Sequence, residues 1–234
     1  FVKEGTFPGL EYPRIPGHEV VGTVDALGEG VGQWSADQRV GVGWHGGHCF
    51  ECEACREGDF IQCENAQITG IAFDGGYAEY TVVPAEAVAA VPEELGSAEA
   101  APLLCAGITV YNALRNTDAT AGDVVAVQGI GGLGHLALQC ADQMGFRTVA
   151  LSRGTDKEEL AYELGADDYI DTEGGDAAEQ LQNLGGARVL LATAPNCQAM
   201  TEVIDGLGRA GKLLVVAASG EPIELSPLQL IGAR

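Results

Sequence analysis

The stretch VVAVQGIGGLG, residues 124–134, decides the fold of the second half of this protein. A run of small and β-branched residues, typical of a buried strand, leads directly into Gly129, Gly131 and Gly134, and a helical pattern follows. The first glycine permits a tight turn, the second lets a pyrophosphate approach the backbone, and the third lets helix and strand pack closely. Free N–H groups at the positive end of the helix dipole can then receive phosphates. With a strand before it and a helix after it, the motif predicts a dinucleotide-binding site.

The remainder of the second half continues the alternation of strand and helix. Because strands that alternate with helices form right-handed βαβ units, the pattern predicts a parallel, doubly wound sheet of the Rossmann type. Five strands are visible, one fewer than the usual six. The expected strands are residues 124–127, 148–151, 168–170, 189–192 and 213–216, and the expected helices are residues 133–144, 157–164, 177–184 and 198–207.

The end of the second strand indicates which dinucleotide binds. An NAD site usually has an acidic residue about 20 residues beyond the glycines, where it accepts a hydrogen bond from the ribose 2′-hydroxyl. Here the strand ends in Ser152 and Arg153, and a hydroxyl beside a guanidinium suits a 2′-phosphate. The rival acid, Asp156, stands just before a helical pattern and is interpreted as its N-cap. NADP(H) is therefore favoured over NAD(H), and the expected cofactor-binding residues are Gly129, Gly131, Gly132, Leu133, Gly134, Ser152, Arg153 and Lys157.

The first part of the chain has a less regular rhythm of short apolar runs broken by glycine and proline. Such runs predict a mostly antiparallel β domain with strands at residues 20–24, 39–42, 78–83 and 87–91. A helical pattern interrupted by Pro102 covers residues 98–114. Because the rhythm changes near residue 110, we expect one domain over residues 1–109 and a second over residues 110–234, in an α/β protein.

Four of the seven cysteines crowd into fifteen residues. An odd number in a chain of this length argues against a disulfide framework. The spacing C-x2-C-x2-C-x7-C lets four thiolates turn toward one point and satisfy a tetrahedral zinc ion, with no position left open for substrate. Turn-forming glycines surround the cysteines, and little periodic apolar pattern would otherwise hold this loop. We therefore expect a structural zinc site at Cys49, Cys52, Cys55 and Cys63.

The composition excludes several classes of partner. With 12 basic and 34 acidic residues, the chain carries a formal net charge of −22, whereas nucleic acids are held by basic surfaces. No run of about 18 apolar residues could span a bilayer, and no charged-then-apolar leader opens the sequence. We therefore expect a soluble, cytoplasmic protein with no nucleic-acid or membrane partner. Such an acidic, lysine-poor surface also suits high salt, where screening relieves self-repulsion.

Three further residues stand in contexts that suggest chemistry. His18 and Glu19 precede an apolar strand pattern, and Cys105 lies in the helical pattern that proline interrupts. A lone histidine or cysteine is most often structural. Together with the cysteine loop and the glycine motif, however, these residues closely resemble the zinc-dependent alcohol dehydrogenases of the medium-chain dehydrogenase/reductase superfamily. The resemblance is nearest to the cinnamyl-type and related bacterial enzymes.

The resemblance covers nearly the whole chain and implies a GroES-like catalytic domain followed by a Rossmann domain. It implies reversible hydride transfer between an alcohol and NAD(P)+, which gives an aldehyde or ketone. His18 and Cys105 match catalytic zinc ligands, and Glu19 matches a residue beside that metal that can join it as ligands exchange. Trp44 matches an aromatic wall of the alcohol pocket, and the four clustered cysteines match the structural zinc ligands. The resemblance also implies a homodimer or homotetramer.

The sequence departs from the family pattern at both ends. The family's third catalytic zinc ligand is a cysteine in a Cys-x-Ser/Thr-Asp stretch, which also supplies a hydroxyl for proton relay and would fall just before Phe1. The family chain would also continue past Arg234 with a sixth strand. We therefore expect the sequence to be trimmed at both ends and to hold catalytic zinc poorly by itself.

Two other interpretations stay open. A zinc-free reductase of the same superfamily would act on activated alkenes or quinones with NADPH, but such relatives usually lack the four-cysteine loop and a residue like His18. A non-enzymatic module, in which zinc staples a nucleotide-binding domain, would require a protein that is naturally this short. Zinc content separates the three: two ions per whole subunit for the dehydrogenase, one for the module and none for the reductase.

Overall fold

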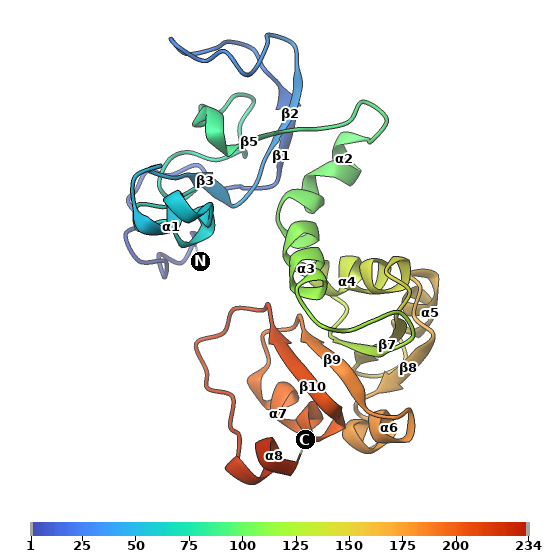
Figure 1. Cartoon of the computed structure of the whole chain (residues 1–234). Coiled ribbons are helices and arrows are strands. Elements are labelled where there is room, and N and C mark those ends of the chain that lie inside the picture. Colours follow the sequence, from blue (N-terminus) through green and yellow to red (C-terminus); the bar gives the residue numbers. More distant parts are fainter. Residues whose placement is uncertain (1, 233–234) are drawn as a thin grey trace. The chain divides into compact units, whose positions relative to one another are not determined.

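The computed structural model describes residues 2–232, and the chain divides into two compact units, Phe1–Cys105 and Ala106–Arg234 (Figure 1). The sequence pattern puts the division between residues 109 and 110, which lie inside helix α3 (Ala106–Arg115). No helix among the described residues has both the length and the apolarity needed to cross a bilayer.

The second unit contains the parallel sheet that the glycine motif predicts. Its five strands run parallel in the order β10–β9–β6–β7–β8. Since β6 lies between β7 and β9, the strand order reverses there, and ligands bind at such a switch point in doubly wound sheets. The strands are β6 (Val124–Gln128), β7 (Arg147–Ser152), β8 (Asp168–Asp171), β9 (Ala187–Ala192) and β10 (Leu207–Val215).

Helices cover both faces of this sheet (Figure 1). Val125 and Val127 of β6 belong to a core with side chains of α3, α4 and α5, whereas Val124 and Ala126 belong to a second core with α6 and α7. A strand that is buried on both faces reads as a continuous apolar run, which is why the sequence predicted it well. The helices are α4 (Gly132–Gln143), α5 (Glu158–Glu163), α6 (Ala177–Asn183), α7 (Cys197–Val203) and α8 (Pro227–Gly232).

The last strand and the helix before it differ from their predicted bounds. The helix expected to reach residue 207 ends at Val203, and β10 begins at Leu207 instead of residue 213. Near its start β10 runs very close to its neighbour, since a Cβ on Gly211 would lie 2.6 Å from the Ala187 carbonyl oxygen. Glycine interrupts the apolar pattern here because close strand approach requires it, and the interruption hid the first half of the strand.

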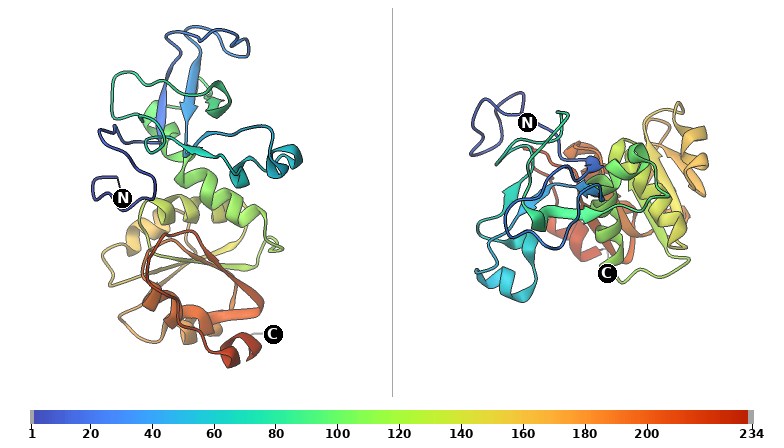
Figure 2. Two further views of the ribbon diagram at one scale, coloured as in Figure 1. Left: turned by 90° about the vertical axis from the view of Figure 1, so that its left-hand side faces the viewer. Right: turned by 90° about the horizontal axis from the view of Figure 1, so that it is seen from above.

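The first unit is an irregular β structure, as the sequence predicts. Strands β1 (Val20–Thr23), β2 (Arg39–Val42) and β5 (Val88–Ala90) form an antiparallel sheet with β2 in the middle. Figure 2 shows β1 and β2 side by side. A second ladder pairs β3 (His45–Gly47) with β4 (Gln67–Ile68), and the short helices are α1 (Glu53–Glu57) and α2 (Ser97–Ala100).

The strand expected over residues 78–83 is wrong. In the described part of the chain this segment pairs with no strand, and Tyr80 and Val82 are 73% and 90% exposed. Its apolar residues alternate as they do in a strand. An extended segment becomes a strand, however, only where a neighbour supplies the hydrogen bonds of the ladder.

The helical pattern over residues 98–114 is divided into three pieces. Helix α2, a 3-10 segment (Ala101–Leu104) and α3 follow one another. Pro102 has no backbone N–H to donate, and Cys105 leaves the helical conformation with φ −130° and ψ −74°. Cys105 therefore lies at a break between two helical segments.

Candidate functional site

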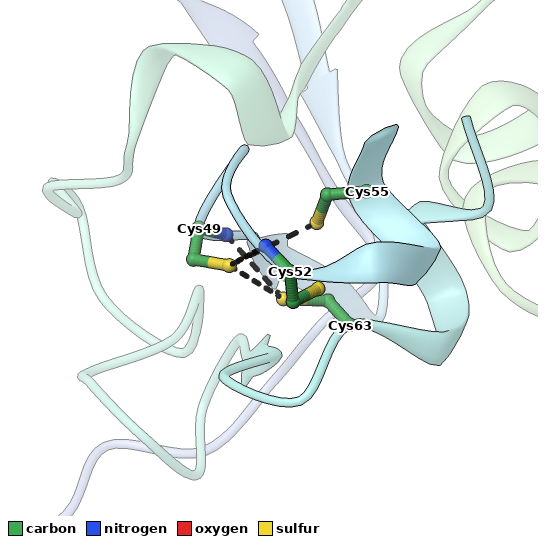
Figure 3. Close-up of side chains that lie close together, drawn as sticks. All are labelled: Cys49, Cys52, Cys55 and Cys63. Atoms are coloured by element: carbon green, nitrogen blue, oxygen red, sulfur yellow. Dashed lines mark hydrogen bonds between the residues drawn. The ribbon is translucent and has the colours of Figure 1, made fainter. Parts of the chain in front are cut away.

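Four cysteines converge in the first unit, as their spacing predicts (Figure 3). Their sulfur atoms all lie within 4.8 Å of one another. The Sγ atom of Cys49 is 4.0 Å from that of Cys55 and 3.6 Å from that of Cys63. Four zinc–sulfur bonds of about 2.3 Å in a tetrahedron put neighbouring sulfurs about 3.8 Å apart. With Cys52, which precedes α1, the set therefore fits one zinc ion.

Backbone N–H groups favour ionised sulfur in this cluster. The N–H groups of Cys52 and Glu51 donate to Cys49 Sγ at 3.4 and 3.5 Å, and these hydrogen bonds lower the pKa of Cys49 to about 6. Burial and the neighbouring thiols raise the pKa of Cys55 to about 12. Thiols this close together cannot all ionise unless a cation balances their charge, so the cluster suits a metal that displaces protons as it binds.

Two histidines stiffen the start of the same loop. Nε2 of His45 lies 2.9 Å from Nδ1 of His48, and the His48 ring stacks on Phe60 at 4.0 Å between centroids. Neither histidine belongs to the four-sulfur group. Their contacts therefore support the loop and do not extend its ligand set.

His18 and Glu19 lie directly before β1, after a sharp turn of the backbone. Gly17 has φ +107°, and a Cβ there would lie 2.8 Å from the ring of Tyr77. Both the left-handed conformation and the close approach require glycine. A distant segment fixes the peptide of Gly17, because the N–H of Gly76 donates to the Gly17 carbonyl oxygen at 3.0 Å.

Cys105 lies in the same part of the first unit. A Cβ on Gly43 would lie only 2.2 Å from the carbonyl oxygen of Leu104, so the residue before Cys105 touches the end of β2. Trp44 follows Gly43, and its ring meets that of His18 edge to face, with 5.0 Å between centroids. These contacts bring the backbone just before Cys105, Trp44 and His18 into one part of the unit although the sequence separates them widely.

The charge of Glu19 acts on both of the residues predicted to bind catalytic zinc. Burial lowers the pKa of His18, and the charge of Glu19 partly opposes this effect. Burial raises the pKa of Cys105, and Glu19 raises it further. A neutral imidazole is the form that binds metals, and a nearby cation would restore the thiolate of Cys105.

The three side chains are near one another without forming a complete ligand set. Among the residues that the structure describes, the four clustered cysteines are the one group of three or more ligand atoms close enough to share an ion. His18, Glu19 and Cys105 do not form such a group in this structure.

A pair of aromatic rings lies on one side of His18, with Trp44 in contact with it. Trp44, which is 38% exposed, contacts Phe7 edge to face at 5.9 Å as well as His18. Phe7 therefore lies against the residue that the sequence analysis expects to form a pocket wall. The sequence did not reveal Phe7, because a single aromatic residue in a loop gives no periodic signal.

The three motif glycines of the second unit have different surroundings. Gly129 has φ +93°, and a Cβ on Gly134 would lie 1.9 Å from the carbonyl oxygen of Gly129. A Cβ on Gly131 would meet no atom within 4 Å. The tight turn, the close packing and the open cradle are thus the three arrangements that the motif predicts.

A cavity of about 950 Å³ opens at the carboxyl ends of strands β6, β7, β8 and β9. Its volume is in the range of ligand pockets. Gly134 packs behind it, but the other seven residues expected to bind a cofactor line it: Gly129, Gly131, Gly132, Leu133, Ser152, Arg153 and Lys157. Gln128 also lines the cavity and is only 6% exposed, yet its Oε1 atom has no hydrogen-bond partner among the described residues. An open cradle and an unpaired buried acceptor both fit a bound dinucleotide.

Two acidic residues follow or face Ser152: Asp156 lies four residues further on, and Asp171 pairs with Ser152 across β7 and β8. Oδ1 of Asp171 accepts hydrogen bonds from the N–H groups of Gly154 and Glu173, at 2.7 and 2.9 Å. The interpretation of Asp156 as an N-cap is wrong, because Lys157 occupies that position of α5. The Nζ atom of Lys157 donates to the Ile130 carbonyl oxygen at 2.8 Å, which fixes it against the glycine loop.

The ends of the neighbouring strands supply lining residues that the sequence analysis missed. Oγ1 of Thr193, directly after β9, donates to the carbonyl oxygens of Gly129 and Gln128 at 2.8 and 3.0 Å. Thr172 and Asn196 line the same cavity. The rule that ligands bind at the carboxyl ends of strands around a switch point could have identified these positions.

Comparison with known families matches both halves of the chain. Residues 1–93 match the family described as "Alcohol dehydrogenase GroES-like domain", and residues 132–234 match "Zinc-binding dehydrogenase". The alcohol dehydrogenase notN of an Aspergillus species is 48% identical over 223 residues, which cover 95% of this chain and 66% of that protein. An alcohol dehydrogenase of Geobacillus stearothermophilus is 40% identical over 91% of this chain and 64% of its own length.

Solved structures give the same result. A cobalt- and zinc-bound thermostable alcohol dehydrogenase from Pyrobaculum aerophilum has a TM-score of 0.86 at 30% identity, with 99% of this chain and 68% of that chain covered. A cinnamyl alcohol dehydrogenase from Sorghum bicolor has a TM-score of 0.85 at 32% identity, with 96% and 66% covered. The chain spans 55–66% of the length of the three fungal relatives that it matches.

Proposed function

Since the chain belongs to the family of zinc-binding alcohol dehydrogenases with a GroES-like domain, we propose that the whole protein transfers hydride reversibly between a small alcohol and NADP(H). The observation that carries the proposal is that His18, Trp44 and the backbone just before Cys105 lie in one part of the first unit, where the charge of Glu19 acts on the pKa of both His18 and Cys105. An imidazole, a thiol and a carboxylate in one region form a donor set for zinc. His18, Cys105 and, on ligand exchange, Glu19 are the residues that would hold it.

The residues of this chain have separate tasks in that reaction. When bound, zinc would supply Lewis acidity toward a hydroxyl oxygen, and the nicotinamide would supply or accept the hydride. His18 presents a neutral ring nitrogen, because burial holds its pKa low. Trp44 and Phe7 form an apolar wall that orients an alcohol and excludes water. The N–H groups that follow Gly129 receive the pyrophosphate at the start of α4.

Zinc content and turnover of the whole protein test the assignment. We expect two zinc ions per subunit, of which His18→Ala or Cys105→Ala removes one. Each substitution should lower kcat at least about a hundredfold, whereas NADPH binding survives because its cavity lies in the other unit. Cys140→Ala, at a half-buried thiol of the second unit, is the matched control and should keep both ions. Full activity in both ligand variants would defeat the proposal.

The choice of NADP(H) depends on Ser152 and Arg153 at the rim of the cavity. A guanidinium binds phosphate through charge-assisted hydrogen bonds. The carboxylate of Asp171, which is the acidic group opposite Ser152, already accepts two backbone hydrogen bonds and is therefore less free to accept one from a ribose hydroxyl. Arg153→Ala should lower kcat/KM for NADP+ at least about tenfold and leave kcat/KM for NAD+ nearly unchanged. Steady-state kinetics with both cofactors and a small panel of alcohols measure this. Equal losses with the two cofactors would mean that Arg153 does not read the 2′-phosphate.

The alternatives become outcomes of the same zinc measurement. One ion per whole subunit would favour a zinc-stapled nucleotide-binding module, and none would favour a zinc-free reductase. The proposal extends to a homodimer or homotetramer, which light scattering would detect, and to the cytoplasm. Seven cysteines without a disulfide support a reducing compartment.

A further inference from the structure

We propose that Asp74 is a positioning residue for His18, which acts through the backbone of residues 15–17. Asp74 lies 56 residues further along the chain, in the loop that follows β4. The inference rests on the proposed function, because it treats His18 as a zinc ligand. It adds a residue to which neither the sequence motif nor the family description gives a role.

The Asp74 carboxylate holds the segment before His18 at two points. Its Oδ1 atom accepts a hydrogen bond from the N–H of Ile15 at 3.0 Å and from Nη1 of Arg14 at 3.2 Å. The Arg14 side chain is only 16% exposed, whereas that of Asp74 is 54% exposed. Asp74 therefore covers a largely buried guanidinium and fixes the neighbouring peptide at the same time.

The residues after Asp74 continue this attachment up to the residue before His18. The N–H of Gly75 donates to the Ile15 carbonyl oxygen at 2.7 Å, and the N–H of Tyr77 donates to that of Pro16 at 3.0 Å. Gly76 donates to the carbonyl oxygen of Gly17, as described above. Each of the three peptides before His18 is therefore bound by the loop that begins at Asp74.

Close packing makes this arrangement sensitive to small shifts. A Cβ on Gly75 would lie 2.1 Å from the Gly17 carbonyl oxygen, and a Cβ on Gly70 would lie 2.9 Å from the Gly17 nitrogen. The backbone of residues 70–75 is in contact with that of Gly17, so neither segment can move without the other. Because Gly17 also has a positive φ, loss of the Ile15 attachment would let the turn relax and rotate the His18 ring away from its ligand position.

A pair of conservative variants tests the inference in the whole protein. Asp74→Asn keeps an oxygen that can accept from the Ile15 N–H but removes the charge, whereas Asp74→Glu keeps the charge but displaces the acceptor by one methylene. Competition with a chelator of known affinity measures how tightly each of the two zinc ions is held. We expect Asp74→Glu and Asp74→Ala to weaken the ion bound by His18 about tenfold or more. Asp74→Asn should hold it nearly as tightly as the unmodified protein.

Four controls make the result specific. The binding of the zinc ion by the four cysteines and the affinity for NADPH should not change in any variant, because the Asp74 side chain bonds to Arg14 and Ile15, which belong to neither site. Asp25→Ala removes an exposed carboxylate from the same unit and should leave both zinc affinities unchanged. The unfolding temperature of each variant shows whether a loss is specific to the metal.

The outcomes separate the two hypotheses. Unchanged zinc affinity in Asp74→Glu and Asp74→Ala would overturn the positioning role, as would an equal loss in Asp74→Asn, since the charge and not the acceptor would then matter. If the unmodified whole protein binds no zinc beyond that of the four cysteines, the proposed function itself fails. If Asp74→Ala does not fold, the Asn and Glu variants alone decide the question.

Discussion

Gly131 and Gly134 belong to one motif, but different neighbours make each of them necessary. A Cβ at Gly134 would collide with the carbonyl oxygen of Gly129, whereas a Cβ at Gly131 would enter open space at the wall of the cavity. Gly131 therefore serves binding and Gly134 serves packing. A sequence motif cannot express this difference, because both positions are simply glycine.

Alanine at these two positions should separate stability from binding. Gly134→Ala should destabilise the protein by about 1–3 kcal/mol, since helix and strand must move apart. Gly131→Ala should leave the unfolding temperature within about 1 °C but weaken NADPH binding at least about tenfold, because the added methyl group blocks the pyrophosphate. Thermal denaturation and fluorescence titration measure the two effects. A large loss of stability in Gly131→Ala would contradict the assignment of the open cradle.

At the scale of elements, one carboxylate joins the last two strands of the parallel sheet to the loop before β6. Asp118 accepts from Nη2 of Arg188 on β9 at 2.6 Å and from Nζ of Lys212 on β10 at 2.7 Å. The hydrogen bond from Lys212 and the charge of Arg188 hold the pKa of Asp118 below its usual value of 3.8. A lowered pKa means that the folded state favours the ionised form.

The contribution of Asp118 to stability should therefore depend on pH and salt. It is fully present above pH 3.8, where the group is ionised in both states, and is lost as the pH falls through the lower value of the folded state. Asp118→Asn should lower the unfolding temperature by about 2 °C at neutral pH in dilute buffer. The difference should shrink in strong acid or in high salt. A difference that is constant from pH 7 to pH 2 would rule out the ion pairs as its cause.

The zinc loop illustrates how an element can be stable without a core. Only Cys55 and Cys63 are buried among its four ligands, and Phe50, Phe60 and Ile61 nearby are exposed. Few apolar side chains therefore hold the loop, and a metal bound by the four thiolates would supply the missing cross-links. For this reason the spacing of four cysteines predicted the element better than any pattern of hydrophobic residues.

At the scale of the whole molecule, the excess of acidic residues governs how stability responds to salt. A charge of −22 in a chain of this size creates self-repulsion that mobile ions screen. The unfolding temperature should therefore rise by several degrees between about 0.1 M and about 1 M KCl, opposite to the effect on Asp118. NaCl at equal ionic strength is the control for a specific effect of potassium. Maximal stability without salt would contradict the prediction.

What the sequence determined by itself depends on short-range geometry. The alternation of strand and helix, the turn at Gly129 and the convergence of four cysteines each follow from residues that are neighbours along the chain. Local backbone conformation and side-chain periodicity suffice to encode such features. The predicted Rossmann sheet and the convergence of the four cysteines are confirmed for this reason.

The tertiary structure decided the features that require distant segments to meet. Residues 78–83 have the pattern of a strand but pair with none in the described chain. The contact of Phe7 with Trp44 and the attachment of Asp74 to Ile15 join segments far apart in sequence. Such contacts depend on how whole elements pack against each other, and a window of neighbouring residues carries no record of that packing.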